Sequence, residues 1–135
     1  MSDVVAAVYN LSFGLGSTYL QIIEYLQSKN ALLSTTYIVN TIKHYLNSGL
    51  LVQPFGNDGP VAITSRVMPI IDFTSGLEFR SIDMVVDLMD KKYTSTTYHR
   101  NDVKNTINNM VKMNYFDMEV VGNKIYIKLS STVVV

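Results

Sequence analysis

The sequence contains no cysteine, so disulfide bonds and thiol chemistry are excluded. It has no excess of either charge, because 11 basic side chains balance 11 acidic ones, and this neutrality gives no overall electrostatic attraction to nucleic acid. Apolar runs of the ~18 residues that span a membrane are also missing, and residues 1–17 lack the basic start of a secretory signal. We therefore expect no membrane association and a cytoplasmic location.

Charged residues make up only 16% of the 135 residues and apolar residues 47%, so the chain can bury a core and is not expected to be disordered. Its length suits one ordinary domain or two very small ones. Asparagine, tyrosine, threonine and methionine are frequent, which favours an AT-rich genome such as that of a phage or virus. If the protein is viral, its expected location is the host cytoplasm.

An internal repeat indicates two similar units. The segments Tyr19–Lys29 and Ile82–Lys92 align without a gap and carry apolar side chains at positions i, i+3, i+4 and i+7, which is one face of a helix. We expect an amphipathic helix in each segment, with this face in the core. The matching pairs are Tyr19/Ile82, Ile22/Val85, Ile23/Val86 and Leu26/Met89.

A second pair of helices follows. The segments Asn40–Leu51 and Asn105–Phe116 also align, but their separation is larger by two positions, so the turn of the second unit contains a short insertion. Both helices are expected to end in a left-handed residue, because Gly49 is matched by Asn114. The tetrapeptide Ser-Thr-Thr-Tyr also occurs twice, but its copies at 34–37 and 95–98 are out of step with both alignments and not strictly equivalent. The expected core pairs are Ile42/Ile107, Tyr45/Met110 and Leu46/Val111.

Each second helix leads into a predicted β-hairpin. In Phe116–Leu129 the dipeptide Gly122-Asn123 suits a two-residue turn. The first unit has a looser turn at 56–60, between strands expected within 50–55 and 61–67, and the connector 68–80 is expected to hold a strand-like apolar patch and a glycine turn. The register of the second hairpin predicts the apolar pairs Phe116–Leu129, Met118–Ile127 and Val120–Ile125 on one face, and Asp117–Lys128, Glu119–Tyr126 and Val121–Lys124 on the other.

This order of two helices and a hairpin resembles the winged helix-turn-helix superfamily, in two copies at Thr18–Arg66 and Ser81–Ser130. The resemblance implies an α+β fold of tandem winged-helix units packed together. The first unit would occupy residues 1–79, including an N-terminal extension and the connector, and the second residues 80–135. In this superfamily the last helix commonly enters the DNA major groove and the hairpin contacts the backbone or minor groove. Tandem members also serve as protein-interaction modules without nucleic acid.

Polar side chains gather on the last helix of the second unit. Arginine suits guanine, asparagine suits adenine and lysine suits phosphate, whereas the alternative interpretation is an ordinary solvated face. Asn101 is expected to cap the helix, and Lys124 lies at the tip of the hairpin. The candidate DNA-binding residues are Tyr98, His99, Arg100, Asn101, Lys104, Asn105, Asn108, Lys112 and Lys124, with Lys43 of the first unit expected to contribute less.

The charge distribution also favours the second unit. Residues 1–79 carry three basic and five acidic side chains, and residues 80–135 carry eight and six. The first unit then becomes a candidate for dimerisation or partner binding, and the apolar residues of segments 1–17 and 131–135 offer surface for self-association. Its exposed helix candidates are Thr35, Thr36, Tyr37, Asn40, Lys43 and His44.

No residue pattern indicates catalysis, a cofactor or a metal. Asp83, Asp87 and Asp90 share a helix face, for which a solvated acidic surface is the simpler interpretation. The two histidines lie in different repeats, and Phe13–Ser17 lacks the lysine of a phosphate-binding loop. We therefore expect a small double-stranded-DNA-binding transcriptional regulator, dimeric and not an enzyme. The alternative is a tandem winged-helix adaptor, a polymerase- or host-directed factor that binds protein instead of DNA.

Overall fold

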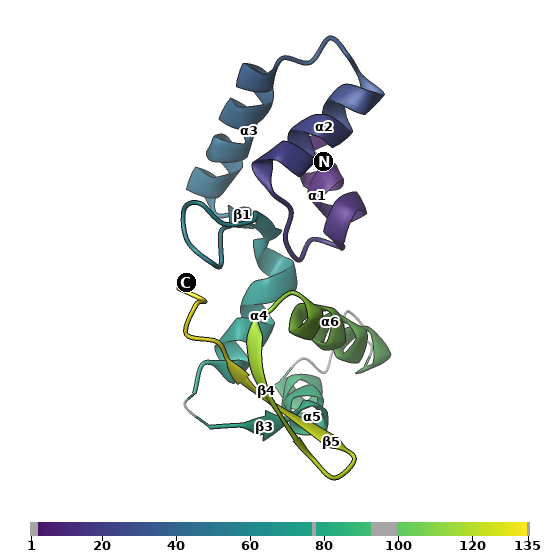
Figure 1. The fold of residues 1–135 in the computed structure, drawn as a ribbon, viewed down its shortest axis with the longest axis vertical. Coiled ribbons are helices and arrows are strands. Elements are labelled where there is room, and N and C mark those ends of the chain that lie inside the picture. Colours follow the sequence, from purple (N-terminus) through teal and green to yellow (C-terminus); the bar gives the residue numbers. More distant parts are fainter. Residues whose placement is uncertain (1–2, 77, 93–99, 135) are drawn as a thin grey trace. The chain divides into compact units, whose positions relative to one another are not determined.

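The computed structural model describes residues 3–76, 78–92 and 100–134 (Figure 1). These residues form six helices and five short strands, so the α+β class predicted from the sequence is confirmed. None of the helices in these ranges is long and apolar enough to cross a membrane. The helices are α1 (Asp3–Ser12), α2 (Tyr19–Lys29), α3 (Thr35–Ser48), α4 (Thr64–Thr74), α5 (Ile82–Lys92) and α6 (Arg100–Lys112). The strands are β1 (Leu51–Val52), β2 (Ala62–Ile63), β3 (Arg80–Ser81), β4 (Phe116–Val121) and β5 (Lys124–Leu129).

The chain forms two compact units, unit 1 of residues 1–68 with 134–135 and unit 2 of residues 69–133. Both follow the same order of elements: a helix, a short strand or bridge, two helices and two antiparallel strands. In unit 1 these are α1, the bridge between Ser17 and Val61, α2, α3, β1 and β2. In unit 2 they are the second part of α4, β3, α5, α6, β4 and β5. The compact units divide within α4, and the domain boundary after residue 79 stays a prediction.

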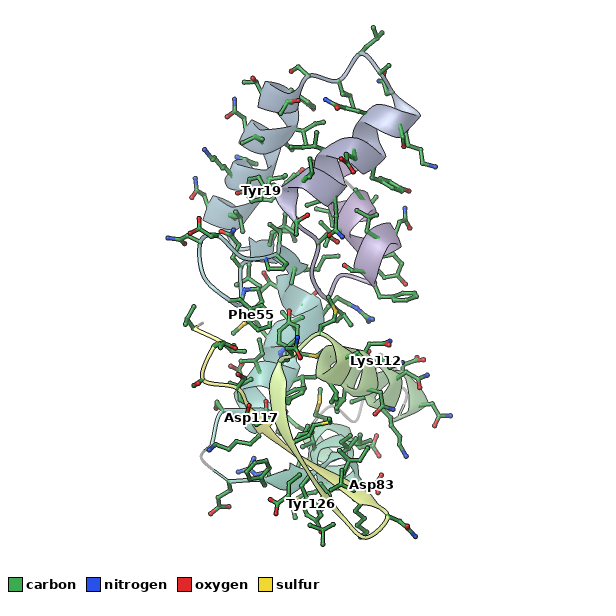
Figure 2. The ribbon with its side chains drawn as sticks, in the orientation of Figure 1. Tyr19, Phe55, Asp83, Lys112, Asp117 and Tyr126 are labelled. Atoms are coloured by element: carbon green, nitrogen blue, oxygen red, sulfur yellow. The ribbon has the colours of Figure 1, made fainter. Side chains whose placement is uncertain are left out.

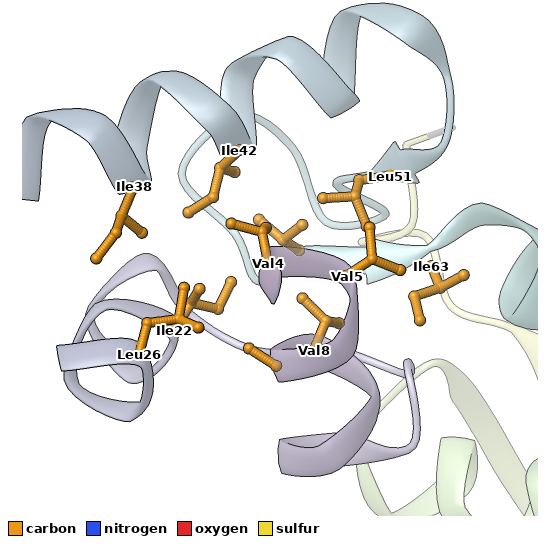
Figure 3. Packing of buried hydrophobic residues seen from close by; sticks show 11 residues of the cluster. Val4, Val5, Val8, Ile22, Leu26, Ile38, Ile42, Leu51 and Ile63 are labelled. Atoms are coloured by element: carbon orange, nitrogen blue, oxygen red, sulfur yellow. The ribbon is translucent and has the colours of Figure 1, made fainter. Parts of the chain in front are cut away.

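Three helices supply the core of unit 1. Side chains of α1, α2 and α3 point toward one another, and Leu51 and Ile63 of the strands complete the cluster (Figure 3). Val4 and Val8 of α1 are 2% and 0% exposed, so the prediction that residues 1–17 offer an apolar surface is wrong for this face. The reason is helical spacing, which turns the side chains at positions 4, 5, 7 and 8 inward. The apolar side chains of this segment that stay exposed are Tyr9, Leu11 and Phe13.

The internal repeat is visible in the burial of both units. The repeat also begins earlier in the chain than Thr18, its predicted start. Ala7 and Val8 align with Ile70 and Ile71 at the same separation as α2 with α5, and all four residues are buried. Helices α1 and α4 are therefore equivalent positions of the repeat. The predicted core pairs that are fully buried are Ile22/Val85, Leu26/Met89 and Ile42/Ile107, and the half-buried pair is Leu46/Val111.

Hydroxyl side chains cap the N-terminal ends of several helices. The Thr18 hydroxyl accepts a hydrogen bond from the Gln21 N–H at 3.1 Å, and the Gln21 side chain accepts from the Thr18 N–H at 2.9 Å, which is a capping box at the start of α2. Ser34 of the first Ser-Thr-Thr-Tyr copy caps α3 through its hydroxyl. In unit 2, Ser81 is the position equivalent to Thr18 and accepts from the Met84 N–H at 3.1 Å. The second Ser-Thr-Thr-Tyr copy lies outside the described residues.

The connector is helical, not strand-like as predicted. Residues 64–74 form α4, and β2 ends at Ile63 instead of continuing toward residue 67. Burial of one helical face outweighs the β-branched composition and the interior Pro69, which removes one helical hydrogen bond. The buried residues of α4 have the spacing i, i+3, i+4 and i+7 and are Val67, Ile70, Ile71 and Thr74.

The β4–β5 hairpin has the predicted register, from Val121–Lys124 at the turn to Phe116–Leu129 at the base. Gly122 takes a left-handed φ of 62°, as a two-residue turn with glycine first requires. Strand β3 pairs with the other side of β5, so the strand order is β3-β5-β4. The apolar face of the hairpin is buried only near its base. Toward the turn, its exposed side chains are Met118, Val120 and Ile125.

Tyr115 is fully buried in unit 2, and burial raises the pKa of its phenol above the ordinary value of 10.0. As pH rises, the phenol loses its proton in the unfolded chain before it does so in the folded protein. The contribution of the neutral phenol to the free energy of unfolding is therefore complete below pH ~10 and is lost as pH rises through the folded-state pKa. We expect Tyr115→Phe to flatten the alkaline loss of unfolding free energy by up to ~1.4 kcal/mol per pH unit. Urea unfolding at several alkaline pH values measures this. Tyr37→Phe, at an exposed side chain, is the control, and equal slopes for the two variants would contradict the prediction.

The ends of α3 and α6 confirm the predicted left-handed residues, with φ of 84° at Gly49 and 67° at Asn114. A Cβ at Gly49 would meet no atom within 4 Å. A substitution there therefore causes no steric clash with other residues, and its cost is the strain of a left-handed backbone conformation. We expect Gly49→Ala to lower the free energy of unfolding by ~1–2 kcal/mol. Gly49→Asn should cost less than half as much, because asparagine tolerates this conformation at the equivalent position. Denaturant unfolding compares the two variants, and equal losses would refute this explanation.

Candidate nucleic-acid interface

A polar stripe runs along the outer face of α6. Its members lie at positions i, i+3, i+4, i+7 and i+11, which share one side of a helix, and all are exposed. The opposite side, with Val103, Ile107 and Met110, is buried. No acidic residue belongs to the stripe, because Asp102 lies about 100° to one side of it. The α6 stripe consists of Asn101, Lys104, Asn105, Asn108 and Lys112.

The start of α6 differs from the sequence expectation. The helix already includes Arg100, so Asn101 lies within its first turn and is not the cap. Asn101 is exposed on the stripe instead. Tyr98 and His99, the other candidates from this segment, lie outside the described residues. For Arg100 the structure gives the helical backbone position, at the N-terminal end of the stripe.

One lysine of the α6 stripe has an acidic neighbour. The Lys104 Nζ lies 3.5 Å from the Asp83 Oδ1 at the start of α5, and the two side chains are 51% and 57% exposed. At such exposure an ion pair contributes little and is screened by salt, so Lys104 can exchange Asp83 for a phosphate at little cost. Lys112 is exposed at the other end of the stripe (Figure 2).

The β4–β5 hairpin presents charges of both signs. Lys124 is exposed beside the turn, whereas Lys128 is half-buried with its Nζ 5.7 Å from the centre of the Phe79 ring. Lys128 thus contacts an aromatic ring, although Asp117 is its neighbour across the strands. Asp117 and Glu119 are exposed, and the strand register places them on the same face as these lysines. A nucleic-acid backbone approaching the hairpin would therefore meet a basic tip and an acidic flank.

An equivalent stripe occurs on α3 in unit 1. Its four members align with four members of the α6 stripe, and all are exposed. Asn47 was not among the predicted candidates, although its alignment with Lys112 identifies it. Helix α3 contains no acidic residue, but its stripe has one lysine where the α6 stripe has two. The α3 stripe consists of Thr36, Asn40, Lys43 and Asn47.

The other candidates on α3 make local contacts. The Thr35 hydroxyl accepts a hydrogen bond from the Gln27 amide at 3.1 Å. The His44 ring meets the Tyr45 ring edge-on, with centroids 5.4 Å apart. Tyr37 belongs to a surface pocket of about 320 Å³ whose other lining residues are Asp3, Val4, Leu26, Leu33, Thr41 and Tyr45.

Neither compact unit has a net charge. Unit 1 contains three basic and three acidic side chains, and unit 2 contains eight of each. The imbalance found in the sequence arose because Asp72 and Glu78, which belong to unit 2, were counted with the range 1–79. Any attraction between unit 2 and DNA must therefore come from local separation of charge. The α6 stripe provides one, because it contains no acidic residue, although Asp83 of α5 lies beside its Lys104.

The acidic side chains of α5 form a solvated face. Asp83, Asp87 and Asp90 are exposed, and Asp83 is engaged by Lys104. Within the described ranges, no group of three or more histidine, cysteine or acidic residues could hold a metal ion. The arrangement therefore suggests an electrostatic role for Asp83, beside the α6 stripe.

The exposure of the Lys104–Asp83 pair predicts a small contribution to stability. A double-mutant cycle of Lys104→Met, Asp83→Asn and the combined variant should give a coupling energy of ~0.2–1 kcal/mol in denaturant unfolding. The coupling should shrink when salt is added, because exposed charges are screened. A coupling that is larger than ~2 kcal/mol and insensitive to salt would mean that the pair is a structural element and cannot be exchanged for a phosphate.

Comparisons of the chain with models of protein families, with curated proteins and with solved structures gave no significant match.

Proposed function

We propose that the protein is a small double-stranded-DNA-binding transcriptional regulator whose α6 enters the major groove. The observation that carries this proposal is the α6 stripe, in which asparagine and lysine share one exposed, acid-free face. A helix of 13 residues is ~20 Å long, and the major groove admits such an element. Asn105 and Asn108 then face base edges, where asparagine pairs with adenine, and Lys104 and Lys112 reach phosphates.

The shared order of elements supports a winged-helix arrangement of both units. In this proposal α3 and α6 are the recognition helices, and the hairpins β1–β2 and β4–β5 are the wings. Lys124, at the tip of the second wing, approaches the DNA backbone, and Arg100 adds a base-reading side chain at the start of α6. Lys43 contributes less, because the α3 stripe offers no second lysine.

Dimerisation is part of this proposal. A neutral protein is not drawn to DNA from a distance, so the local contacts of one α6 stripe give weak binding. A homodimer presents two stripes to one duplex, and the two helices then occupy half-sites separated by one helical turn. The exposed side chains of Tyr9, Leu11 and Phe13 on unit 1 offer apolar surface for this association.

A protein-interaction adaptor is the second candidate function. It is favoured by the neutrality of both units and by the apolar side chains of the hairpin, where Met118 is 54% and Val120 is 65% exposed. The acidic flank of the same hairpin is unsuited to a phosphate backbone. In this case the hairpin makes the main contact, with a polymerase or a host protein as the partner.

Fluorescence anisotropy with a labelled duplex at several salt concentrations tests the DNA-binding proposal. Each phosphate contact should add roughly −0.9 to the slope of log affinity against log salt. Lys112→Ala and Lys124→Ala should each remove one such contact, weaken binding to all sequences and flatten the slope by about 1. Arg100→Ala and Asn105→Ala should instead cost ~1–3 kcal/mol, mainly on the preferred sequence.

Lys91→Ala is the matched control, because it removes an exposed lysine of unit 2 that lies outside the α6 stripe and the hairpin. It should leave both the affinity and the slope unchanged. If the wild-type protein shows no salt-dependent binding to duplex DNA at low ionic strength, the regulator proposal fails and the adaptor proposal replaces it.

A further inference from the structure

The edge strand β4 is open to pairing with a further strand. It lies at the end of the order β3-β5-β4, so one of its sides is unpaired among the described residues. In a hairpin with a two-residue turn, the two residues that flank the turn, here Val121 and Lys124, form backbone hydrogen bonds with each other. Farther from the turn, residue pairs with and without such hydrogen bonds alternate along the strands. The backbone N–H and C=O groups of Met118 and Val120 therefore point away from β5. No other backbone group in the described ranges bonds to them.

The two faces of this edge differ in chemistry. Met118 and Val120 are exposed on the face that continues the apolar core beyond Phe116. Asp117 and Glu119 are exposed on the other face, where neither makes an ion pair with another described residue. The edge thus combines unpaired backbone groups with alternating apolar and acidic side chains.

Like charges disfavour the pairing of two copies of this chain through β4. In an antiparallel partner strand, the residues opposite Met118 and Val120 must be ones whose backbone N–H and C=O groups point toward β4. If Met118 lies opposite Met118 of the second copy, Asp117 of one copy lies opposite Glu119 of the other. If Met118 lies opposite Val120 of the second copy, the two Glu119 side chains lie opposite each other. Like charges directly opposite each other destabilise a sheet, whereas basic side chains at these positions would be attracted.

We propose that β4 binds an extended segment of another protein in which basic and apolar side chains alternate. The segment adds to the sheet as an antiparallel strand, and its backbone pairs with the open groups of Met118 and Val120. Its apolar side chains lie beside these two residues, and its lysine or arginine side chains face Asp117 and Glu119. This surface is separate from the α6 stripe, so the proposal adds a peptide partner and stands or falls independently of DNA binding.

Titration of the ¹⁵N-labelled full chain with a capped hexapeptide of alternating lysine and valine tests the proposal by NMR. We expect chemical-shift changes and slower amide exchange at Met118 and Val120. Glu119→Lys replaces an attractive pair by a repulsive one, so this peptide should bind roughly 2- to 30-fold more weakly. The same variant should bind an alternating glutamate–valine peptide more tightly than the wild type does.

Glu24→Lys is the matched control, because Glu24 is an exposed acid on α2 in unit 1 and the change in net charge is the same. It should leave the affinities for both peptides unchanged. Glu119→Gln, which removes the charge without reversing it, should give an intermediate affinity for the lysine–valine peptide.

The proposal is overturned if millimolar lysine–valine peptide leaves Met118 and Val120 unaffected. It is also overturned if the wild type binds both peptides equally, or if Glu24→Lys weakens binding as much as Glu119→Lys. Any of these results would mean that the acidic side chains only guard an open edge against aggregation, as charges on edge strands commonly do.

Discussion

Each unit depends on burying one face of three short helices at the same time. The helices contain 10 to 14 residues, a length at which an isolated helix is marginal in water. Their stability must therefore come from the shared core, in which Ile22, Ile38 and Ile42 of unit 1 are completely buried. This constraint also sets the rotation of every helix about its axis. Because Val103, Ile107 and Met110 must point inward, the asparagines and lysines of the α6 stripe must point outward together.

The same constraint explains how much of the fold could be predicted from the sequence. Helices α2, α3, α5 and α6 were predicted because large apolar side chains recur with helical spacing, and the β4–β5 register followed from alternation and a glycine turn. Helices α1 and α4 were missed. Valine and alanine dominate the inward face of α1, and α4 contains Pro69 among β-branched residues, so local preference gave no helix signal and tertiary burial decided. The alignment of Val8 with Ile71 was the clue that the sequence offered.

For the candidate site, the sequence predicted which side chains are exposed but not what they touch. The exposure of Asn105, Asn108 and Lys112 follows from helical phase alone. The contact of Lys104 with Asp83 joins two helices, and that of Lys128 with Phe79 joins β5 to the segment before β3. Such contacts depend on how elements pack in space, which spacing within one element does not determine. The exposed apolar side chains near the hairpin turn are of the same kind, because alternation predicts an apolar face but not where the core beneath it ends.

The contrast between α6 and the hairpin limits how unit 2 can meet DNA. Helix α6 offers an acid-free stripe, whereas the outer face of the hairpin carries Asp117 and Glu119 between its lysines. Phosphates repel those carboxylates, so a duplex held by α6 has only the tip of the hairpin, at Lys124, as a favourable contact. The rest of the hairpin then remains uncovered, with the open edge of β4 facing solvent. The acidic side chains that weaken the hairpin as a DNA contact therefore favour a basic peptide strand, so the two proposed partners would use separate surfaces of unit 2.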